Sequence, residues 1–182
     1  LLGQNVDSYG KNLNDGTNFA KLLKTLDELE GDFRIRFTSS YPTDITDEVI
    51  ETVKNSKKIC ECFHIPMQSG NDRILKAMNR RYNVEEYSKI VEKIRNNIEN
   101  VAITSDFIAG FPSETEEEFN DTIKAIDVLQ LDYSNTAAYS PRPFTPAGKM
   151  TDKFVPDEIK KQRLQILNDK VKLASLKSNE KY

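Results

Sequence analysis

Residues 101–118, with the sequence VAITSDFIAGFPSETEEE, hold the side chains best placed for binding chemistry. Asp106 interrupts a run of β-branched and apolar residues typical of a buried parallel strand, so its carboxylate needs a partner. Gly110 permits a sharp turn and close backbone approach, and either Ser113 with Glu116 or Thr115 with Glu118 can form a capping box at the next helix. Helix N-termini at the carboxyl ends of parallel strands present N–H groups to ligands, which predicts a cofactor site here. An ordinary βα turn is the alternative that this segment alone leaves open.

Polar side chains also follow the strand predicted at residues 60–65. Gln68 and Ser69 precede a helix, where a side-chain amide and a hydroxyl can orient a polar ligand. Capping of that helix by Ser69 or Asn71 is the alternative. His64, the only histidine, either acts as an acid or base near the strand end or donates one hydrogen bond to a neighbouring strand.

Asp106 has two interpretations of its own. Its carboxylate could hold a ribose or an ammonium group of a cofactor. It could equally form a structural ion pair with Arg34, Arg36 or Arg142.

These residues are positioned by strands and helices that alternate along the chain with short connections. Strands are predicted to end near residue 2 and to cover residues 33–37, 60–65, 101–109 and 132–140, and helices to cover residues 17–30, 46–53, 71–78, 83–97, 115–129 and 156–178. Such alternation predicts an α/β fold with a parallel sheet and right-handed crossovers. Polar residues end every strand and no GxGxxG follows the first, which favours a partial (β/α) barrel over an open sheet. We expect the barrel to cover residues 1–150 and a flanking helix to occupy residues 151–182.

The two ends of the chain look like cut points. Residues 1–5 have the pattern of a strand end followed by a polar loop, so we expect the first strand to lie upstream. The exposed sheet edge left by its absence would favour self-association. The charged final helix is expected to lead to a further domain.

Composition indicates one soluble globular domain, with 37% hydrophobic and 30% charged residues and a net charge of −3. No membrane span or signal pattern is visible, so a cytoplasmic protein without a membrane partner is expected. The acidic balance restricts any nucleic-acid contact to a local basic patch. Candidates for it, unless they are ordinary solvated helix charges, are Arg73, Lys76, Arg80, Arg81, Lys89, Lys93 and Arg95. Cys60 and Cys62 are expected to be reduced core thiols, not metal ligands.

Five segments together resemble the radical S-adenosylmethionine (SAM) methylthiotransferases in order and spacing. They are LLGQN, IRFTSSYP, HIPMQSGNDRILKAMNRRY, ITSDFIAGFPSETEEEF and YSPRPFTPAGKM, and the resemblance covers residues 1 to about 167. IRFTSSYP is most similar to the subgroup that acts on isopentenyl-adenosine in tRNA. Relatives that act on threonylcarbamoyl-adenosine in tRNA or on a ribosomal protein are the alternative, and a non-catalytic RNA-binding fragment is a further one.

The resemblance implies a barrel that binds SAM beside a four-iron, four-sulfur (4Fe–4S) cluster. In the family, a deoxyadenosyl radical abstracts hydrogen from carbon 2 of the adenine beside the anticodon. A second 4Fe–4S cluster delivers sulfur, and a second SAM supplies the methyl group. The full-length protein would then be a methylthiotransferase with the tRNA anticodon loop as its partner.

The resemblance also implies the site residues by position. Three residues match the loop that meets the methionyl amine: Gly3, Gln4 and Asn5. Four match polar strand ends that face the methionyl and ribose groups: Ser39, Gln68, Ser69 and Asp106. Three match the segment flanking adenine: Ile108, Gly110 and Phe111. Tyr139 and Arg142 are expected to contact the substrate, and no catalytic residue or metal ligand is assigned.

The sequence departs from the family in several places. It lacks the C-x-x-x-C-x-x-C loop that binds the radical cluster, the N-terminal domain with the second cluster, and the C-terminal RNA-binding β-barrel. Cys60 and Cys62 cannot replace three thiolates in a loop, so the chain alone is expected to be inactive. Phe144 stands where the family usually has glycine.

Overall fold

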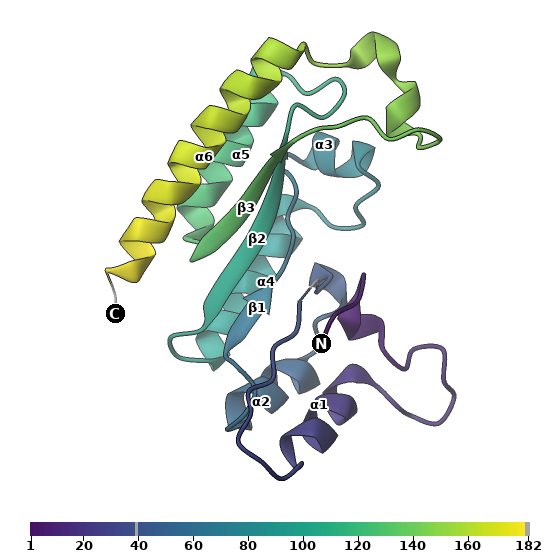
Figure 1. Ribbon diagram of the computed structural model, residues 1–182, viewed down its shortest axis with the longest axis vertical. Coiled ribbons are helices and arrows are strands. Elements are labelled where there is room, and N and C mark those ends of the chain that lie inside the picture. The colour runs from purple at the N-terminus through teal and green to yellow at the C-terminus, as the bar shows by residue number, and fades with distance from the viewer. Residues whose placement is uncertain (39, 181–182) are drawn as a thin grey trace. The chain divides into compact units, whose positions relative to one another are not determined.

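The computed structural model describes residues 1–38 and 40–180. Within these residues, three strands and six α-helices follow one another along the chain (Figure 1). The chain divides into two compact units, called unit 1 and unit 2. Unit 1 consists of Leu1–Pro66 and Glu86–Thr104, and unit 2 of Met67–Glu85 and Ser105–Tyr182.

Unit 1 is built on a short parallel strand pair. Its elements are the 3-10 helices η1 (Val6–Ser8) and η2 (Pro42–Asp44), the helices α1 (Phe19–Asp27), α2 (Asp47–Asn55) and most of α4 (Val84–Asn97), and the strand β1 (Cys62–His64). β1 pairs in parallel with the first residues of β2 (Ala102–Ala109), so that Phe63 lies opposite Ile103. Three buried rings, Phe19, Phe37 and Phe63, meet edge to face with centroids 5.3 and 5.5 Å apart, an arrangement that favours the ring quadrupoles.

Unit 2 contains the second half of β2. Its further elements are α3 (Asp72–Ala77), α5 (Glu116–Leu129), β3 (Tyr133–Ala138), the 3-10 helices η3 (Ala147–Lys149) and η4 (Thr151–Lys153), and α6 (Asp157–Asn179). β3 is the neighbour of β2, and α6 runs alongside α5 and packs against β3 (Figure 1). Contacts joining Asn135 to Asp106 and Tyr139 to Ala109 advance in the same direction on both strands, which makes the pair parallel. The expected parallel α/β class is therefore confirmed.

Local sequence signals explain most helix starts. Asn18, Thr46 and Asn71 accept N–H groups of the first turns of α1, α2 and α3. Of the two capping pairs that the sequence offered, Thr115 and Glu118 form the capping box of α5. The predicted helices consequently differ from the observed ones by only a few residues at each end.

Two strand predictions need correction. Residues 33–37 form no strand, and only Ile35 makes a parallel bridge, to Ile59. Ile35 and Phe37 are buried whereas Arg34 and Arg36 are exposed, so the predicted alternation of side chains is present without the hydrogen bonds of a continuous strand. The strand expected to end near Leu2 is likewise not formed by the described residues at the start of the chain.

Among the described residues, no helix is both long enough and apolar enough to cross a membrane.

Gly70 provides a test of the packing in unit 2. A Cβ at this position would lie 2.6 Å from Thr122 Cα and 2.8 Å from Ala125 Cβ, both in α5. We expect Gly70→Ala to lower the free energy of unfolding by roughly 1–3 kcal/mol, because overpacking forces backbone shifts. Urea unfolding measures the change.

The control for this test is Gly3→Ala, because the nearest atom to the added Cβ there is Val6 Cγ1, at 3.3 Å, and the nearest backbone atom is 3.9 Å away. Equal unfolding midpoints for the two variants would contradict the close approach of Gly70 to α5.

Candidate cofactor-binding site

The second half of β2 presents one open face. Phe107 and Ala109 are buried, whereas Asp106 and Ile108 point to the opposite face and are half-buried. The Asn135 side-chain amide of β3 donates to the Asp106 carboxylate at 2.9 Å. A carboxylate and an apolar side chain therefore stand next to each other on an accessible face of unit 2.

Gln68 lies beside Asp106 at the same end of the strands. Its N–H donates to the Asp106 carbonyl at 2.8 Å, and its carbonyl accepts the Ile108 N–H at 3.0 Å. Its φ of 74° is in the left-handed region, which is strained for a residue with a side chain. The two backbone hydrogen bonds hold this conformation, which the sequence alone did not reveal.

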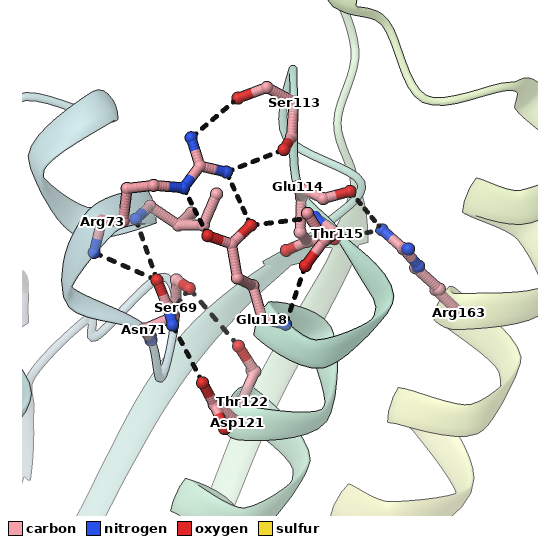
Figure 2. A network of polar contacts seen from close by, with 11 residues as sticks. Ser69, Asn71, Arg73, Ser113, Glu114, Thr115, Glu118, Asp121, Thr122 and Arg163 are labelled. Carbon is pink, nitrogen blue, oxygen red and sulfur yellow. Dashed lines mark hydrogen bonds and ion pairs between the residues drawn. The ribbon is translucent and has the colours of Figure 1, made fainter.

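The segment after Gln68 is fastened to α5 (Figure 2). The Thr122 hydroxyl accepts the Gly70 N–H at 2.9 Å and lies 3.4 Å from the Ser69 hydroxyl. The Asn71 side chain donates to Asp121 at 2.9 Å while it caps α3. Ser69 is fully buried, so its described contacts fix the loop, and its contact with a cofactor stays a prediction.

Gly110 begins the turn that follows β2. Its φ of 75° favours glycine, and its N–H donates to Glu114 Oε2 at 2.7 Å. The next residue, Phe111, is buried and meets the Tyr139 ring edge to face at a centroid distance of 5.2 Å. The Tyr139 hydroxyl is buried without a hydrogen-bond partner among the described residues, so it could serve a ligand.

Glu114 is the buried acid of this turn. Burial raises the pKa of its carboxyl above the ordinary value, while the Gly110 N–H and the Arg163 guanidinium act in the opposite direction. Arg163 Nη1 lies 2.9 Å from Glu114 Oε2. Neither the role of Glu114 nor that of Arg163 was foreseen, because 49 residues separate them in sequence.

Arg142 lies on an exposed turn after β3, and its carbonyl accepts the Thr145 hydroxyl at 2.8 Å. Phe144 in the same turn has a φ of 67° and is 96% exposed. The glycine expected there by family resemblance would adopt this backbone without strain. The substrate contacts assigned to Arg142 and Tyr139 stay predictions.

The remaining candidates lie in unit 1. Gly3 and Gln4 are exposed, and Asn5 donates its side-chain amide to Asp44. Ser39 is outside the described residues. Their expected contact with the methionyl group is therefore still a prediction.

Asp7, which sequence reasoning missed, is a second buried acid. Burial raises the pKa of its carboxyl to about 6, and the nearby charge of Asp44 adds to the rise. The pKa of Asp44 is lowered instead. Burial acts to raise it, but hydrogen bonds from Lys11 and Asn5 outweigh that effect. The local sequence around Asp7 is polar and gave no sign of its burial.

His64 and the cysteines have modest roles in the structure. His64 Nδ1 lies 2.9 Å from the Thr104 hydroxyl of β2, which agrees with the second of its two interpretations, a hydrogen bond to a neighbouring strand. Cys60 and Cys62 are unbridged and half-buried, which places them less deeply than expected for core thiols. The part of the chain that the structure describes contains no group of three His, Cys, Asp or Glu side chains suited to a metal ion. Cys60 and Cys62 therefore do not form a site that fits an iron–sulfur cluster.

Comparison with known proteins places this geometry in context. The family described as the radical SAM superfamily matches residues 3–126. The tRNA-2-methylthio-N(6)-dimethylallyladenosine synthase of Acetivibrio thermocellus is 49% identical over 167 residues, covering 92% of this chain and 35% of that protein. The enzyme of the same name from Thermotoga petrophila is 49% identical over 182 residues, covering 100% of this chain and 41% of that protein.

Solved structures are similar in fold at low identity. Coproporphyrinogen III oxidase from Escherichia coli, a radical SAM enzyme, has a TM-score of 0.69 and 20% identity, over 85% of this chain and 36% of that one. Elp3 from Methanocaldococcus infernus has a TM-score of 0.59 and 15% identity, over 88% of this chain and 38% of that one. The similarity in fold to coproporphyrinogen III oxidase supports the expected partial (β/α) barrel.

Asp7 makes a pH-dependent prediction. An acid whose folded-state pKa is raised destabilises the fold above that pKa, and the penalty disappears as the pH falls below the unfolded value. The rise from 3.8 to about 6 corresponds to about 3 kcal/mol at most. We therefore expect Asp7→Asn to increase the free energy of unfolding at pH 7.5, with the gain shrinking steadily between pH 6 and pH 4.

Asp44→Asn is the matched control for Asp7→Asn. Because the pKa of Asp44 is lowered, its charge stabilises the fold at neutral pH, and the substitution should destabilise. Urea unfolding across the pH range measures both variants. A gain for Asp7→Asn that did not change with pH would show that the Asp7 charge is not its cause.

Phe144 makes a second prediction. The left-handed backbone costs a residue with a Cβ about 1–2 kcal/mol, and part of this is offset by the greater unfolded-state freedom of glycine. We expect Phe144→Gly to stabilise the chain by about 1 kcal/mol in denaturant unfolding. Phe144→Ala keeps the Cβ, so an equal gain in that variant would assign the effect to the exposed ring instead.

Proposed function

We propose that this chain, which belongs to the radical SAM superfamily, is the SAM-binding part of an enzyme that adds a methylthio group to carbon 2 of isopentenyl-adenosine in tRNA. Relatives that carry the corresponding name are 49% identical to it. The chain covers 35% and 41% of the lengths of these relatives, so the reaction itself is assigned to a longer protein.

The observation that supports SAM binding most directly is the arrangement around Asp106. Its half-buried carboxylate can accept hydrogen bonds from ribose hydroxyls, and the adjacent Ile108 can pack against the adenine base. Gln68 presents its strained backbone at the same strand end. The described residues of unit 2 therefore match both the polar and the apolar parts of the cofactor.

SAM, when bound, supplies the radical chemistry of the superfamily. The residues of this chain bind and orient it: Asp106 holds the ribose, Ile108 and Phe111 enclose the adenine, and the Tyr139 hydroxyl is available for a polar group. The described residues offer no cluster ligands, so we assign two 4Fe–4S clusters to other parts of the longer protein. The partner would be the anticodon loop of tRNA, and a tRNA substrate implies a cytoplasmic enzyme.

The experiment is performed on the complete protein that contains this chain, reconstituted with iron and sulfide. tRNA carrying isopentenyl-adenosine is incubated with SAM and reductant, and the nucleosides are analysed by mass spectrometry. We expect the methylthio product with this tRNA but not with tRNA carrying threonylcarbamoyl-adenosine, nor on ribosomal protein. Product on either of those substrates alone would assign the alternative specificity.

Asp106→Asn tests the site within that assay. The substitution keeps the shape of the side chain but removes the charge from its hydrogen bonds, which are worth about 1.5–3 kcal/mol when one partner is ionised. We expect kcat/KM for SAM to fall by roughly 10-fold or more.

Asp127→Asn is the control, because Asp127 lies on the exposed surface of α5, where it pairs with Lys170 of α6. Unchanged kcat/KM in Asp106→Asn would remove Asp106 from the cofactor site.

A further inference from the structure

We propose that α6 belongs to the cofactor site, with Arg163 as a positioning residue that fixes the turn from Gly110 to Glu114. The inference rests on the proposed binding of SAM at this turn. Nothing in the resemblance or in the names of the relatives assigns a role to α6 or to Arg163.

Arg163 makes a buried, branched set of contacts with the start of α5 (Figure 2). Its side chain is 6% exposed and that of Glu114 is 0% exposed. Nη1 lies 2.9 Å from Glu114 Oε2 and 3.1 Å from the Glu114 carbonyl. Nη2 lies 3.0 Å from Glu116 Oε2, and the guanidinium carbon stands 5.3 Å from the centroid of the Phe119 ring. A planar guanidinium suits such a forked site better than a lysine would.

A single carboxylate oxygen connects Arg163 to the Gly110 amide. Glu114 Oε2 accepts both Arg163 Nη1 and the Gly110 N–H, the latter at 2.7 Å. Hydrogen bonds to an ionised acceptor are stronger than neutral ones. The Arg163 charge therefore reaches the Gly110 amide through one atom.

Lys160, one helical turn before Arg163, holds the same turn by contact. A Cβ on Gly110 would lie 2.4 Å from Lys160 Cγ, so the aliphatic part of Lys160 lies directly against the glycine. Lys160 Nζ donates to the Tyr139 carbonyl at 3.3 Å. The ring of Tyr139 in turn packs on Phe111. α6 thus reaches two of the three residues proposed to lie near adenine: it contacts Gly110 directly and is linked to Phe111 through Tyr139.

A second cation, Arg73 of α3, binds the turn from another direction. Arg73 Nη2 lies 2.7 Å from the Ser113 carbonyl and 2.6 Å from Glu118 Oε2. Its side chain is 51% exposed, so solvent screens this interaction. The buried Arg163 is consequently the cation on which the turn depends most.

Loss of the Arg163 charge should change the ionisation of Glu114. The groups that face this carboxyl are Arg163 from α6, the Gly110 N–H from the turn and the acid Glu118 from α5. Arg73 from α3 also interacts electrostatically with it. Removing the buried cation leaves burial and a like charge, both of which favour the protonated acid, opposed only by the half-exposed and solvent-screened Arg73. A protonated Glu114 is a weaker acceptor, so the Gly110 amide is released and the turn loosens.

The test compares four variants of the 182-residue chain. Arg163→Met removes the charge and keeps the bulk, and Arg163→Lys keeps the charge but removes the planar guanidinium that donates to several acceptors. Arg163→Met combined with Glu114→Gln removes both charges and preserves an acceptor for Gly110. Lys170→Met is the matched control. Lys170 lies farther along α6 than Arg163 and makes an ion pair with Asp127 of α5.

Two quantities are measured for each variant: hydrogen exchange of the Gly110 amide by NMR, and the Kd for SAM from chemical-shift titration between pH 6 and pH 8. We expect Arg163→Met to accelerate exchange and to raise Kd by about 10-fold, the effect of losing one charged hydrogen bond. The increase in Kd should be larger at pH 6 than at pH 8. The double variant should recover most of the affinity without the pH dependence, and Lys170→Met should match the unsubstituted chain.

Each outcome decides a separate question. Unchanged Gly110 exchange and Kd in a folded Arg163→Met chain would overturn the proposal. A double variant no better than Arg163→Met would show that Arg163 does not act through the Glu114 carboxyl, which also overturns it. If Arg163→Met does not fold, Gly110 exchange and Kd are compared between the double variant and Arg163→Lys instead. If the unsubstituted chain binds no SAM, the proposed function fails, while the exchange of Gly110 still decides whether Arg163 positions the turn.

Discussion

The buried Glu114 carboxylate is the constraint around which the turn from Gly110 to Glu114 is organised. A carboxylate removed from water needs both a counter-charge and hydrogen-bond donors. Arg163 provides the charge and Gly110 provides a backbone N–H. These requirements fix the end of β2, the start of α5 and the face of α6 in one arrangement within unit 2.

Conformations that disfavour ordinary side chains gather at the same strand ends. Gln68, Gly110 and Ser113 all have positive φ values, of 74°, 75° and 68°. Strain of this kind persists only where surrounding contacts over-determine the backbone. Here the contacts are the hydrogen bonds of Gln68 to β2, of Gly110 to Glu114, and of the Ser113 N–H to the Lys153 carbonyl. The shape of the proposed site is therefore set by backbone groups as much as by the side chains that meet a ligand.

Sequence reasoning succeeded where the determining contacts are local or periodic. The β2 strand, the Thr115–Glu118 capping box and the parallel order of the elements all follow from patterns within a few residues of one another. It failed where partners are distant in sequence: Arg163 meets Glu114 across 49 residues. The left-handed backbone of Gln68 depends on β2 in the same way, and no propensity signals it. The buried Asp7 lies in a polar stretch whose burial comes from tertiary packing, so composition could not reveal it.

The long sequence separation of Arg163 from Glu114 also sets an order of events during synthesis. Domains begin to fold from the N-terminal side as the chain leaves the ribosome. β2 and α5 emerge well before Arg163, so for that interval Glu114 has no guanidinium partner from α6. A nascent chain at this stage would keep the carboxyl hydrated or protonated and the turn open. The turn from Gly110 to Glu114 is therefore among the last parts of unit 2 to reach its final structure, and a ribosome paused before α6 would hold a chain with a sheet but without this finished turn.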